Sequence, residues 1–261
     1  MEKKISKVSI TLVGVGNLGY HLAHALYHAG YQMVQVAGRS RDHVESLAVE
    51  LGCRWTVRLT ELVTDVDLVI LAINDRVLET VIRQVDFGET LVVHTSGAVP
   101  LSVFTGHVKN YGVLYPLQTF SRGRIPDFKG LPFCIEACIP AHTEFLNDLV
   151  FSLTAIPVRI DSAQRAYLHL SAVFVNNFVN HLFGCAEEIM DKAMLPFSLL
   201  APIMRETIAK AQNIGPSNAQ TGPAVRNEEN VIKKHLELLS FSPEMKKLYG
   251  VLTESIRINS I

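Results

Sequence analysis

Short apolar runs alternate with longer segments of helical periodicity over the first 160 residues of the chain. Four of the apolar runs are typical of strands buried on both faces of a parallel sheet: Ser9–Val15, Gln32–Ala37, Leu68–Ile73 and Leu91–His94. The segments between them carry apolar residues at helical spacing: Leu18–Ala29, Asp42–Leu51 and Arg76–Gln84. This alternation with short connections predicts a doubly wound, mostly parallel α/β sheet with helices on both faces.

The pattern changes close to residue 160. Before that point, a predicted helix at Ala141–Leu153 is accompanied by further strand-like segments: Gly112–Phe120, Pro132–Ala137 and Pro157–Ile160. Beyond it the chain is helical in pattern. Residues 162–192 read as one long helix, apolar nearly all round, which we expect to be buried against other helices or a second subunit. We therefore predict an α/β domain over residues 1–160 and an all-helical domain over residues 161–261.

The first predicted strand ends in GVGNLG, residues 14–19, and a helix-like segment follows at once. A strand, a glycine turn and a helix start form the dinucleotide-binding fingerprint of a Rossmann-type sheet. Gly14 allows the tight turn, Gly16 lets the backbone approach a pyrophosphate, and Gly19 lets the helix pack closely. The start of the helix, at Asn17 and Leu18, then offers unpaired amides to the phosphates. The alternative, an ordinary glycine-rich turn, is less consistent with this context.

The end of the second strand indicates which dinucleotide is bound. NAD enzymes usually place an acid there to bind the ribose hydroxyls. This chain has Arg39, Ser40 and Arg41 instead. Guanidinium groups can pair bidentately with the oxygens of a 2′-phosphate, so the sequence favours NADP over NAD. An exposed basic turn without a ligand is the alternative.

Polar residues also follow the next two strands. Ala72, Ile73 and Asn74 form a loop expected beside the pyrophosphate and the nicotinamide ribose, with Asn74 as a ribose or amide contact. Asp75 is expected to cap the following helix.

The sequence HTSG, residues 94–97, ends the strand after that. His94 could be an acid, an orienting donor or a buried histidine, whereas Ser96 is expected to touch cofactor or substrate. Tyr115, Gln118 and Thr119 are expected to line the same cleft.

Polar residues recur at helical spacing on two of the predicted helices. His169, Asn176 and Asn180 share one stripe of the long helix and could offer hydrogen bonds to a carbonyl or carboxylate substrate. A polar network between helices or a dimer interface is the alternative. The histidines of the first helix, at positions 21, 24 and 28, are interpreted as an outward-facing stripe rather than a metal site.

Composition narrows the functional class. Hydrophobic residues make up 48% of the 261 residues and charged residues 19%, which excludes a disordered chain. The formal net charge of −1 argues against binding to nucleic acid or anionic membranes. No apolar run is long enough to span a bilayer, and the charged N-terminus shows no secretory signal. No second pair accompanies Cys134 and Cys138, so we expect free thiols, no metal and a cytoplasmic location.

Six motifs together carry a resemblance to a known family: GVGNLG, GRS, HTSG, GVLYPLQTF, YLHLSAVFVNNF and TGPAVR. They resemble a bacterial family of NADP oxidoreductases in which a Rossmann domain precedes a conserved helical domain, largely without assigned substrates. The chain is also similar to pyrroline-5-carboxylate reductase and, more distantly, to 3-hydroxyacid dehydrogenases and ketopantoate reductase.

This resemblance implies that the glycines of the first turn bind the pyrophosphate and that Arg39, Ser40 and Arg41 hold the 2′-phosphate. It also implies an active site between the domains, close to a homodimer interface made by the helical halves. The sequence departs from the pattern of the hydroxyacid dehydrogenases at the position of the proton donor. The hydroxyacid dehydrogenases place a lysine one turn before a paired asparagine, but Val173 stands at that position here. His169, about one turn further upstream, is our candidate replacement.

The first functional hypothesis is an NADPH-dependent oxidoreductase that moves a hydride to or from a small ketone, imine or 3-oxo acid. His169 is its preferred acid, assisted by Asn176, with His94 and Ser96 as the runner-up. The second is a sensor or scaffold that binds NADP without turnover, which the absent lysine favours. The third is an NADP enzyme with a deazaflavin partner.

Overall fold

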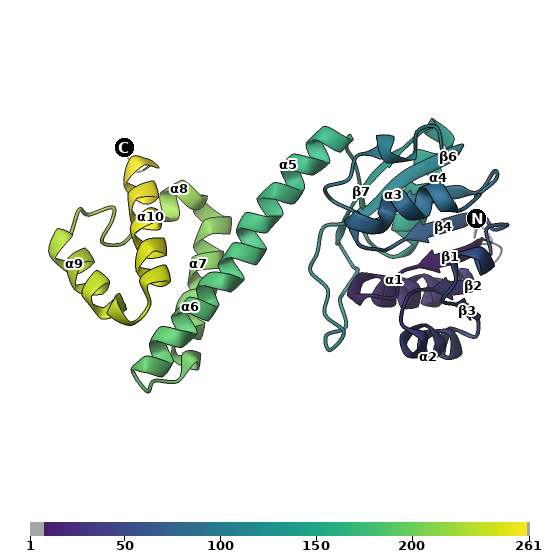
Figure 1. Ribbon diagram of the computed structural model, residues 1–261. Coiled ribbons are helices and arrows are strands. Elements are labelled where there is room, and N and C mark those ends of the chain that lie inside the picture. Colours follow the sequence, from purple (N-terminus) through teal and green to yellow (C-terminus); the bar gives the residue numbers. More distant parts are fainter. Residues whose placement is uncertain (1–7, 260–261) are drawn as a thin grey trace. The chain divides into compact units, whose positions relative to one another are not determined.

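An eight-stranded sheet with strand order β3-β2-β1-β4-β5-β6-β7-β8 forms the centre of the first part of the computed structural model (Figure 1). The structure describes residues 8–259, which fall into two compact units divided after Asn176. Neighbouring strands are parallel except for the antiparallel pair β6 and β7. The strands are β1 (Ser9–Val13), β2 (Gln32–Ala37), β3 (Arg54–Thr56), β4 (Leu68–Leu71), β5 (Leu91–His94), β6 (Asn110–Pro116), β7 (Pro132–Ala137) and β8 (Ile156–Arg159). The predicted Rossmann-type fold class is confirmed.

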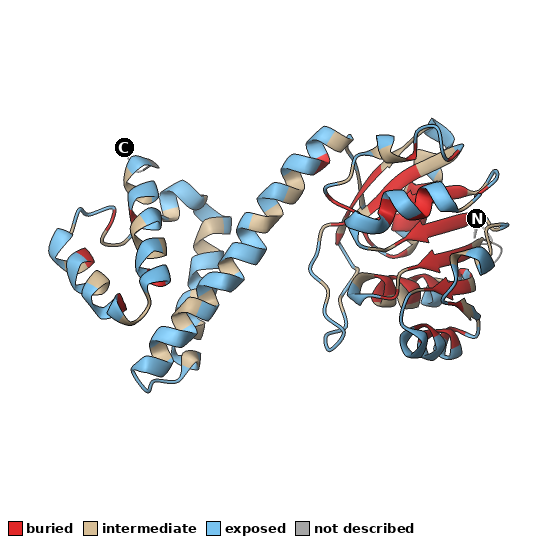
Figure 2. Cartoon of the chain, viewed as in Figure 1, coloured by how far each residue is buried: buried red, intermediate tan, exposed pale blue. Residues whose placement is uncertain are grey.

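Helices cover both faces of this sheet because the central strands are apolar on both sides. In β4, Leu68 and Ile70 face one core cluster and Val69 and Leu71 face the other, as the two-residue period of a strand requires. Buried residues are concentrated in the strands of this sheet (Figure 2). The first cluster contains residues of α1 (Asn17–His28), α2 (Arg41–Leu51) and α4 (Pro140–Ser152). The second contains residues of α3 (Asp75–Gln84) and the short 3₁₀ helix η2 (Leu101–Phe104).

One strand was missed and two local expectations were wrong. The edge strand β3 was not expected, because three residues with polar ends carry no distinct period. The cap of α3 is Asn74, whose Oδ1 accepts a hydrogen bond from the Arg76 amide at 3.0 Å, so Asp75 is the first helical residue rather than the cap. His21 is buried, not on an outer face, because the loop after β6 covers it and Ser121 offers its carbonyl to the ring at 2.9 Å.

The predicted helix over residues 162–192 is present, with a change of helical type in its middle. It comprises α5 (Ser162–Ala172), a π-helical segment η3 (Val173–Phe178) and α6 (Val179–Lys192). A π turn holds more residues than an α turn, so side chains beyond Val173 no longer follow the α-helical spacing on which the His169–Asn180 stripe was based. Such segments occur often at functional sites.

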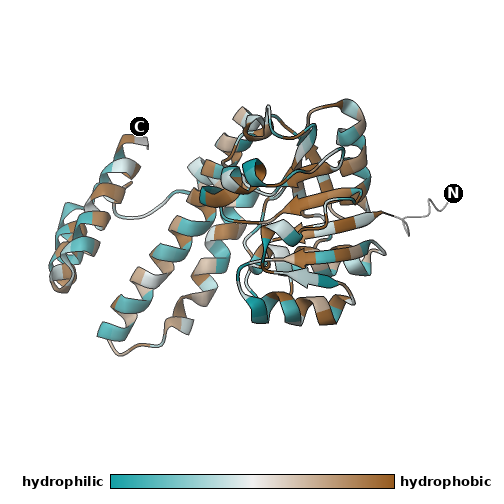
Figure 3. Ribbon diagram, turned by 45° about the vertical axis from the view of Figure 1, so that its right-hand side comes forward, coloured by the Kyte–Doolittle hydropathy of each residue, from teal (hydrophilic) through white to brown (hydrophobic). Residues whose placement is uncertain are grey.

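The second unit is helical. Its further elements are η4 (Phe197–Leu200), α7 (Ala201–Ile214), α8 (Pro216–Ala219), α9 (Glu229–Leu238), η5 (Leu239–Phe241) and α10 (Pro243–Asn259). Only a few apolar side chains there are buried, among them Ile232 and Leu239. Apolar and polar residues are mixed along its helices, whereas the strands of the first unit are mostly hydrophobic (Figure 3). Within residues 8–259, no helix combines the length and apolar character needed to cross a membrane.

A buried ion pair fastens α5 to the sheet. The Arg165 side chain is 1% exposed, and its Nη1 donates to Glu136 Oε2 on β7 at 2.6 Å. Its Nη2 donates to the Val99 carbonyl at 2.7 Å. The Ser162 hydroxyl donates to the same Glu136 oxygen at 2.7 Å and accepts from the Leu101 amide at 2.8 Å. In the sequence, the helical pattern begins at residue 162, the first residue of α5. These contacts explain why α5 nevertheless belongs to the same compact unit as the sheet.

We expect Glu136→Gln to destabilise the protein by about 3–5 kcal/mol, because the buried Arg165 charge loses its counter-charge. The matched control is Glu144→Gln, the same change in the exposed pair of Glu144 with Arg159, which should cost about 1 kcal/mol or less. Urea unfolding of the three proteins measures both values. Equal losses in the two variants would show that the buried pair contributes no more than a surface pair.

Candidate dinucleotide and active site

The glycine turn after β1 is shaped by two close backbone approaches. A Cβ on Gly14, whose φ is +104°, would lie 2.1 Å from the Ala72 carbonyl oxygen. A Cβ on Gly19 would lie 1.8 Å from the Gly14 carbonyl oxygen. Side chains at these two positions would therefore push α1 away from β1 and β4. Gly16 differs, because nothing lies within 4 Å of its Cβ position. Its surface is open, as the close approach of a pyrophosphate to the backbone requires.

The start of α1 supplies donors beside this open surface. The first helical hydrogen bond runs from the Tyr20 amide to the Gly16 carbonyl at 2.9 Å, so the amides of Asn17, Leu18 and Gly19 precede it. Gly16 provides no side-chain cap. Unpaired amides and the positive end of the helix dipole favour an anion here. The Asn17 side chain is not part of this donor set, because its Nδ2 donates to the Phe120 carbonyl at 3.0 Å.

The three polar residues that follow β2 differ in whether their side chains interact with other residues of the protein. Arg39 and Ser40 are exposed, and within residues 8–259 neither side chain forms a hydrogen bond or an ion pair. The guanidinium of Arg41 lies over the Trp55 ring, and its Cζ is 5.2 Å from the ring centroid. Its Nε lies 3.5 Å from Glu45 Oε2. Arg39 and Ser40 are therefore the members of this group that remain available to an external phosphate.

The loop after β4 contacts both β1 and the glycine turn. The Ala72 amide donates to the Val13 carbonyl at 2.7 Å, and the Ala72 carbonyl is the group that a side chain on Gly14 would meet. Ile73 is half-buried against the second core cluster. Asn74 Oδ1 accepts the capping bond of α3, and the side-chain amide nitrogen of Asn74 is available to donate to a ligand.

His94, at the end of β5, lies inside the protein. Its side chain is fully buried and stacks on Phe104 with ring centroids 5.5 Å apart, and its Nδ1 accepts from the Ser96 amide at 3.2 Å. Burial, with a smaller contribution from the Arg165 charge, lowers its pKa to about 3. Ser96 is also buried, and its hydroxyl oxygen accepts from the amides of Ala98 and Val99 at 3.1 and 3.0 Å. Both residues therefore shape the HTSG turn.

His169, on α5, lies beside Gly97, which follows β5, and Tyr115 of β6. Its Nδ1 lies 3.1 Å from the hydroxyl of Tyr115 on β6. A Cβ on Gly97 would lie 2.6 Å from His169 Nδ1 and 2.8 Å from Tyr115 Cζ, so the glycine of HTSG leaves the space that this pair occupies. Tyr115 was expected only as a residue lining the cleft. Its pairing with His169 spans 54 residues and has no local signal in the sequence.

The hydroxyl of Tyr115 can stabilise the tautomer of His169 that carries its proton on Nε2. Burial raises the pKa of Tyr115, so its hydroxyl stays protonated at neutral pH and can donate to Nδ1. When the hydroxyl donates, a neutral His169 carries its proton on Nε2, and a cationic His169 carries one there in any case. Burial also raises the pKa of the nearby Cys134 thiol to about 11, so it adds no charge. The pair can therefore present a proton on the half-exposed imidazole.

Asn176 and Asn177 are placed differently from His169. Both lie in the π-helical segment η3 and are exposed, Asn176 as the last residue of the first unit and Asn177 as the first residue of the second. In the second unit, the Arg226 side chain forms an ion pair with Glu228 at 2.8 Å, so this residue of the TGPAVR loop already has an anionic partner.

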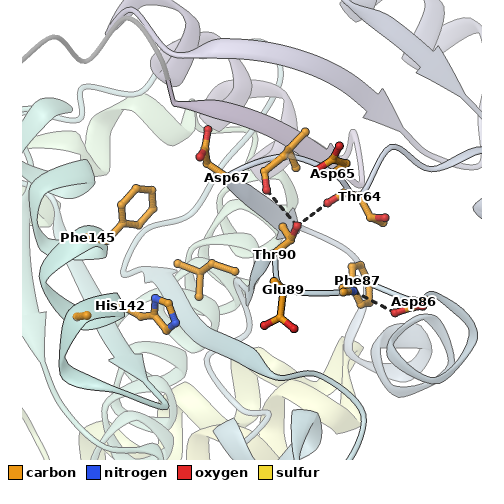
Figure 4. A pocket seen from close by; sticks show the side chains of 13 residues that line it. Thr64, Asp65, Asp67, Asp86, Phe87, Glu89, Thr90, His142 and Phe145 are labelled. Carbon is orange, nitrogen blue, oxygen red and sulfur yellow. Dashed lines mark hydrogen bonds between the residues drawn. The ribbon is translucent and has the colours of Figure 1, made fainter.

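A cavity of about 780 Å³ lies at the amino ends of β4 and β5, opposite the strand ends that carry the candidate site (Figure 4). Carboxylates from two loops line it, with His142 and Phe145 of α4: Asp65, Asp67, Asp86 and Glu89. Ligands of doubly wound sheets bind beyond the carboxyl ends of the strands, so this cavity is distinct from the candidate site. In the part of the chain that the structure describes, no three His, Cys, Asp or Glu side chains are grouped to hold a metal ion.

Comparisons with known proteins agree with this architecture. A family model described as "NADP oxidoreductase coenzyme F420-dependent" matches residues 9–97, and a "Domain of unknown function (DUF2520)" matches residues 131–256. No curated protein matches the sequence.

Several solved structures share the fold. A pyrroline-5-carboxylate reductase from Streptococcus pyogenes is 15% identical with a TM-score of 0.63, over 97% of this chain and 99% of that one. An imine reductase from Myxococcus stipitatus in complex with NADP⁺ is 18% identical with a TM-score of 0.66, over 95% and 91% of the two chains.

A much closer match is a Bacteroides fragilis protein whose crystal structure is described as that of a "putative NADP oxidoreductase". It is 40% identical, with a TM-score of 0.90, over 97% of this chain and 99% of that one. With this identity over nearly its full length, the chain belongs to a family of NADP oxidoreductases that join a Rossmann domain to this helical C-terminal domain.

Proposed function

We propose that the protein is an NADPH-dependent oxidoreductase that transfers a hydride to or from a small ketone, imine or 3-oxo acid. The contact of His169 with Tyr115, on the sheet edge that also carries the glycine turn, is the observation that supports this most directly. NADPH supplies the hydride when bound, and reduction of a C=O or C=N bond also needs a proton. The chain must therefore hold the dinucleotide and present an acid beside it.

The open surface of Gly16 and the amides of Asn17 and Leu18 are proposed to hold the pyrophosphate. Arg39 and Ser40 are proposed to hold the 2′-phosphate, because their polar groups are exposed and uncommitted. Arg41 has a lesser role, since Trp55 and Glu45 engage it. Ala72, Ile73, Asn74 and Ser96 lie in the loops after the adjacent strands, where the remainder of the dinucleotide is expected.

His169 is proposed as the general acid. Its imidazole is half-exposed, its Nδ1 is held by Tyr115, and its Nε2 carries the proton that a substrate would receive. His94 suits this role poorly, because a fully buried imidazole with a pKa of about 3 is neutral and inaccessible at physiological pH. We assign His94 to the support of the HTSG turn. Asn176 remains a proposed substrate contact.

The relatives give some indication of the substrate class. Several proteins of the same fold are described as imine reductases or pyrroline-5-carboxylate reductases, so cyclic imines belong beside keto acids among the compounds to test. From the resemblance alone, we further propose that the substrate is held between the two domains.

We also propose a homodimer formed through the helical domain in the cytoplasm. Large apolar side chains are exposed along this part of the single chain, and a second copy would cover them: Tyr167, Leu170, Phe174, Val175, Ile203 and Ile208. The four free cysteines are typical of a reducing compartment.

Two other functions each rest on one observation. Val173 stands where the hydroxyacid dehydrogenases have a lysine, which favours a sensor that binds NADP without turnover. The description of the family model names coenzyme F420, which favours a deazaflavin partner. A panel of keto acids, cyclic imines and F420 separates the three functions. NADPH oxidation by an organic substrate supports the reductase, exchange with F420 alone supports the deazaflavin enzyme, and tight binding with no oxidation supports the sensor.

We expect His169→Ala to lower turnover about 10²–10⁴-fold, the usual contribution of a positioned proton donor. The dissociation constant for NADPH should stay nearly unchanged, because His169 is not among the phosphate-binding groups. The matched control is His181→Ala, an exposed histidine of α6, which should retain activity. Steady-state kinetics and fluorescence titration measure the two quantities, and full turnover in the His169 variant would remove it as the acid.

Arg39→Ala should weaken NADPH binding about tenfold or more while leaving NADH binding nearly unchanged. The 2′-phosphate is the group that distinguishes the two cofactors, and a charge-assisted hydrogen bond to it is worth about 1.5–3 kcal/mol. Arg41→Ala is the control and should have a smaller effect, since Arg41 is stacked on Trp55. Equal losses for NADPH and NADH would indicate that Arg39 is structural.

The buried His94 should make the protein less stable in acid. The unfolded chain binds a proton near pH 6.5 and the folded protein near pH 3, so stability falls as the pH drops through this window. His94→Asn keeps an acceptor at the Nδ1 position but cannot titrate. Between about pH 6 and about pH 4.5, urea unfolding should show the wild type losing about 2 kcal/mol more than this variant. Identical losses would mean that His94 titrates normally.

A further inference from the structure

The loop between β6 and β7, residues 117–131, lies across the beginning of α1, and we call it the strap. Two carbonyls on the strap receive contacts from that helix. The Phe120 carbonyl accepts from Asn17 Nδ2 at 3.0 Å, and the Ser121 carbonyl lies 2.9 Å from His21 Nε2. His21 is buried beneath it. The strap therefore packs directly against the helix start that faces the proposed phosphate site.

Arg122 lies at the tip of the strap and reaches the glycine turn itself. Its Nη2 donates to the Val15 carbonyl at 2.8 Å, and its Cζ lies 5.2 Å from the centroid of the Tyr20 ring. The tip is narrowed by a bridge between Ser121 and Arg124, in which the Arg124 amide donates to the Ser121 carbonyl at 3.1 Å. A guanidinium held by a carbonyl and an aromatic face has lost much of its rotamer freedom before any ligand arrives.

The charge of Arg122 has no anionic partner in the described residues. Arg58, Arg83 and Arg159 each pair with a carboxylate, whereas Arg122 contacts only a carbonyl and a ring. Nη1 and Nε form no hydrogen bond within residues 8–259 and remain available as donors. Nearby Glu50 accepts from the Tyr20 hydroxyl at 3.3 Å and pairs with His24. An unpaired cation beside Val15 is thus fixed in the turn where a dinucleotide phosphate is expected.

We propose that Arg122 is a phosphate ligand of the bound dinucleotide, carried to the glycine turn by the strap. This rests on the proposed NADP site and adds a cation from outside the βαβ unit that forms it. Either the pyrophosphate or the 2′-phosphate has the anionic oxygens that a guanidinium binds bidentately. A lysine would supply charge but neither the stacking on Tyr20 nor the fork of donors.

The test is binding rather than turnover, with NADPH and NADH titrated by fluorescence against each variant. Arg122→Gln retains a donor for the Val15 carbonyl but removes the charge, and Arg122→Ala removes both. We expect each to weaken NADPH binding about tenfold or more. The matched control, Arg124→Ala on the same exposed strap, should bind NADPH like the wild type. The ionic-strength dependence of the NADPH dissociation constant should also be shallower in both Arg122 variants, which loosening of the strap alone would not produce.

The outcomes separate this proposal from the proposed function. Equal losses for NADPH and NADH support contact with the pyrophosphate, and a loss confined to NADPH supports contact with the 2′-phosphate. Wild-type affinity for both cofactors in the Arg122→Gln protein, or an unchanged salt dependence, would overturn the role of Arg122 while leaving the NADP site intact. A wild-type protein that binds neither cofactor would overturn both.

Discussion

The position of His169 depends on the buried ion pair between Arg165 and Glu136. Arg165 is one helical turn before His169 on α5, and Glu136 lies on β7 within the sheet. Desolvating two charges is costly, and only the close geometry and the additional bonds from Ser162 and Val99 offset this cost. An apolar contact would allow α5 to slide, whereas a directional pair sets its register. That register places His169 in the space that Gly97 leaves open beside Tyr115.

Glycines set the backbone geometry of the proposed cofactor site, as the ion pair sets the position of His169. Gly14 and Gly19 allow β1, β4 and α1 to approach so closely that any side chain would collide with backbone carbonyls. Gly16 faces open space, so its lack of a side chain is not required by packing and leaves room for the proposed pyrophosphate. Gly97 again serves packing, this time between two polar rings. The proposed dinucleotide site and the proposed acid thus lie at the same end of the sheet, at positions where a side chain is absent.

Much of this could be predicted from the sequence, because it depends on local patterns. Apolar runs located the central strands, and the spacing of Gly14, Gly16 and Gly19 identified the turn. The missing parts depend on contacts between distant residues. The Tyr115–His169 contact spans 54 residues, and the Asn17–Phe120 contact spans 103. Burial of His21 follows from the strap, which has no period of its own.

Other differences arise where two local structures compete. The cap of α3 went to Asn74 instead of Asp75, since either residue can cap a helix and only the backbone decides which is extended. The π-helical segment η3 likewise leaves no trace in hydrophobic periodicity, yet it changes the angular relation between His169 and Asn176.

The most direct measurement is a crystal structure of the protein with NADP and an unreactive keto acid or cyclic imine analogue. If His169 is the acid, the electrophilic carbon of the analogue should lie about 3–3.5 Å from the nicotinamide C4. Its oxygen or nitrogen should then lie about 2.6–3.2 Å from His169 Nε2, while Tyr115 retains its bond to Nδ1. An analogue poised at C4 with its heteroatom held by another side chain, and His169 turned away, would contradict this mechanism.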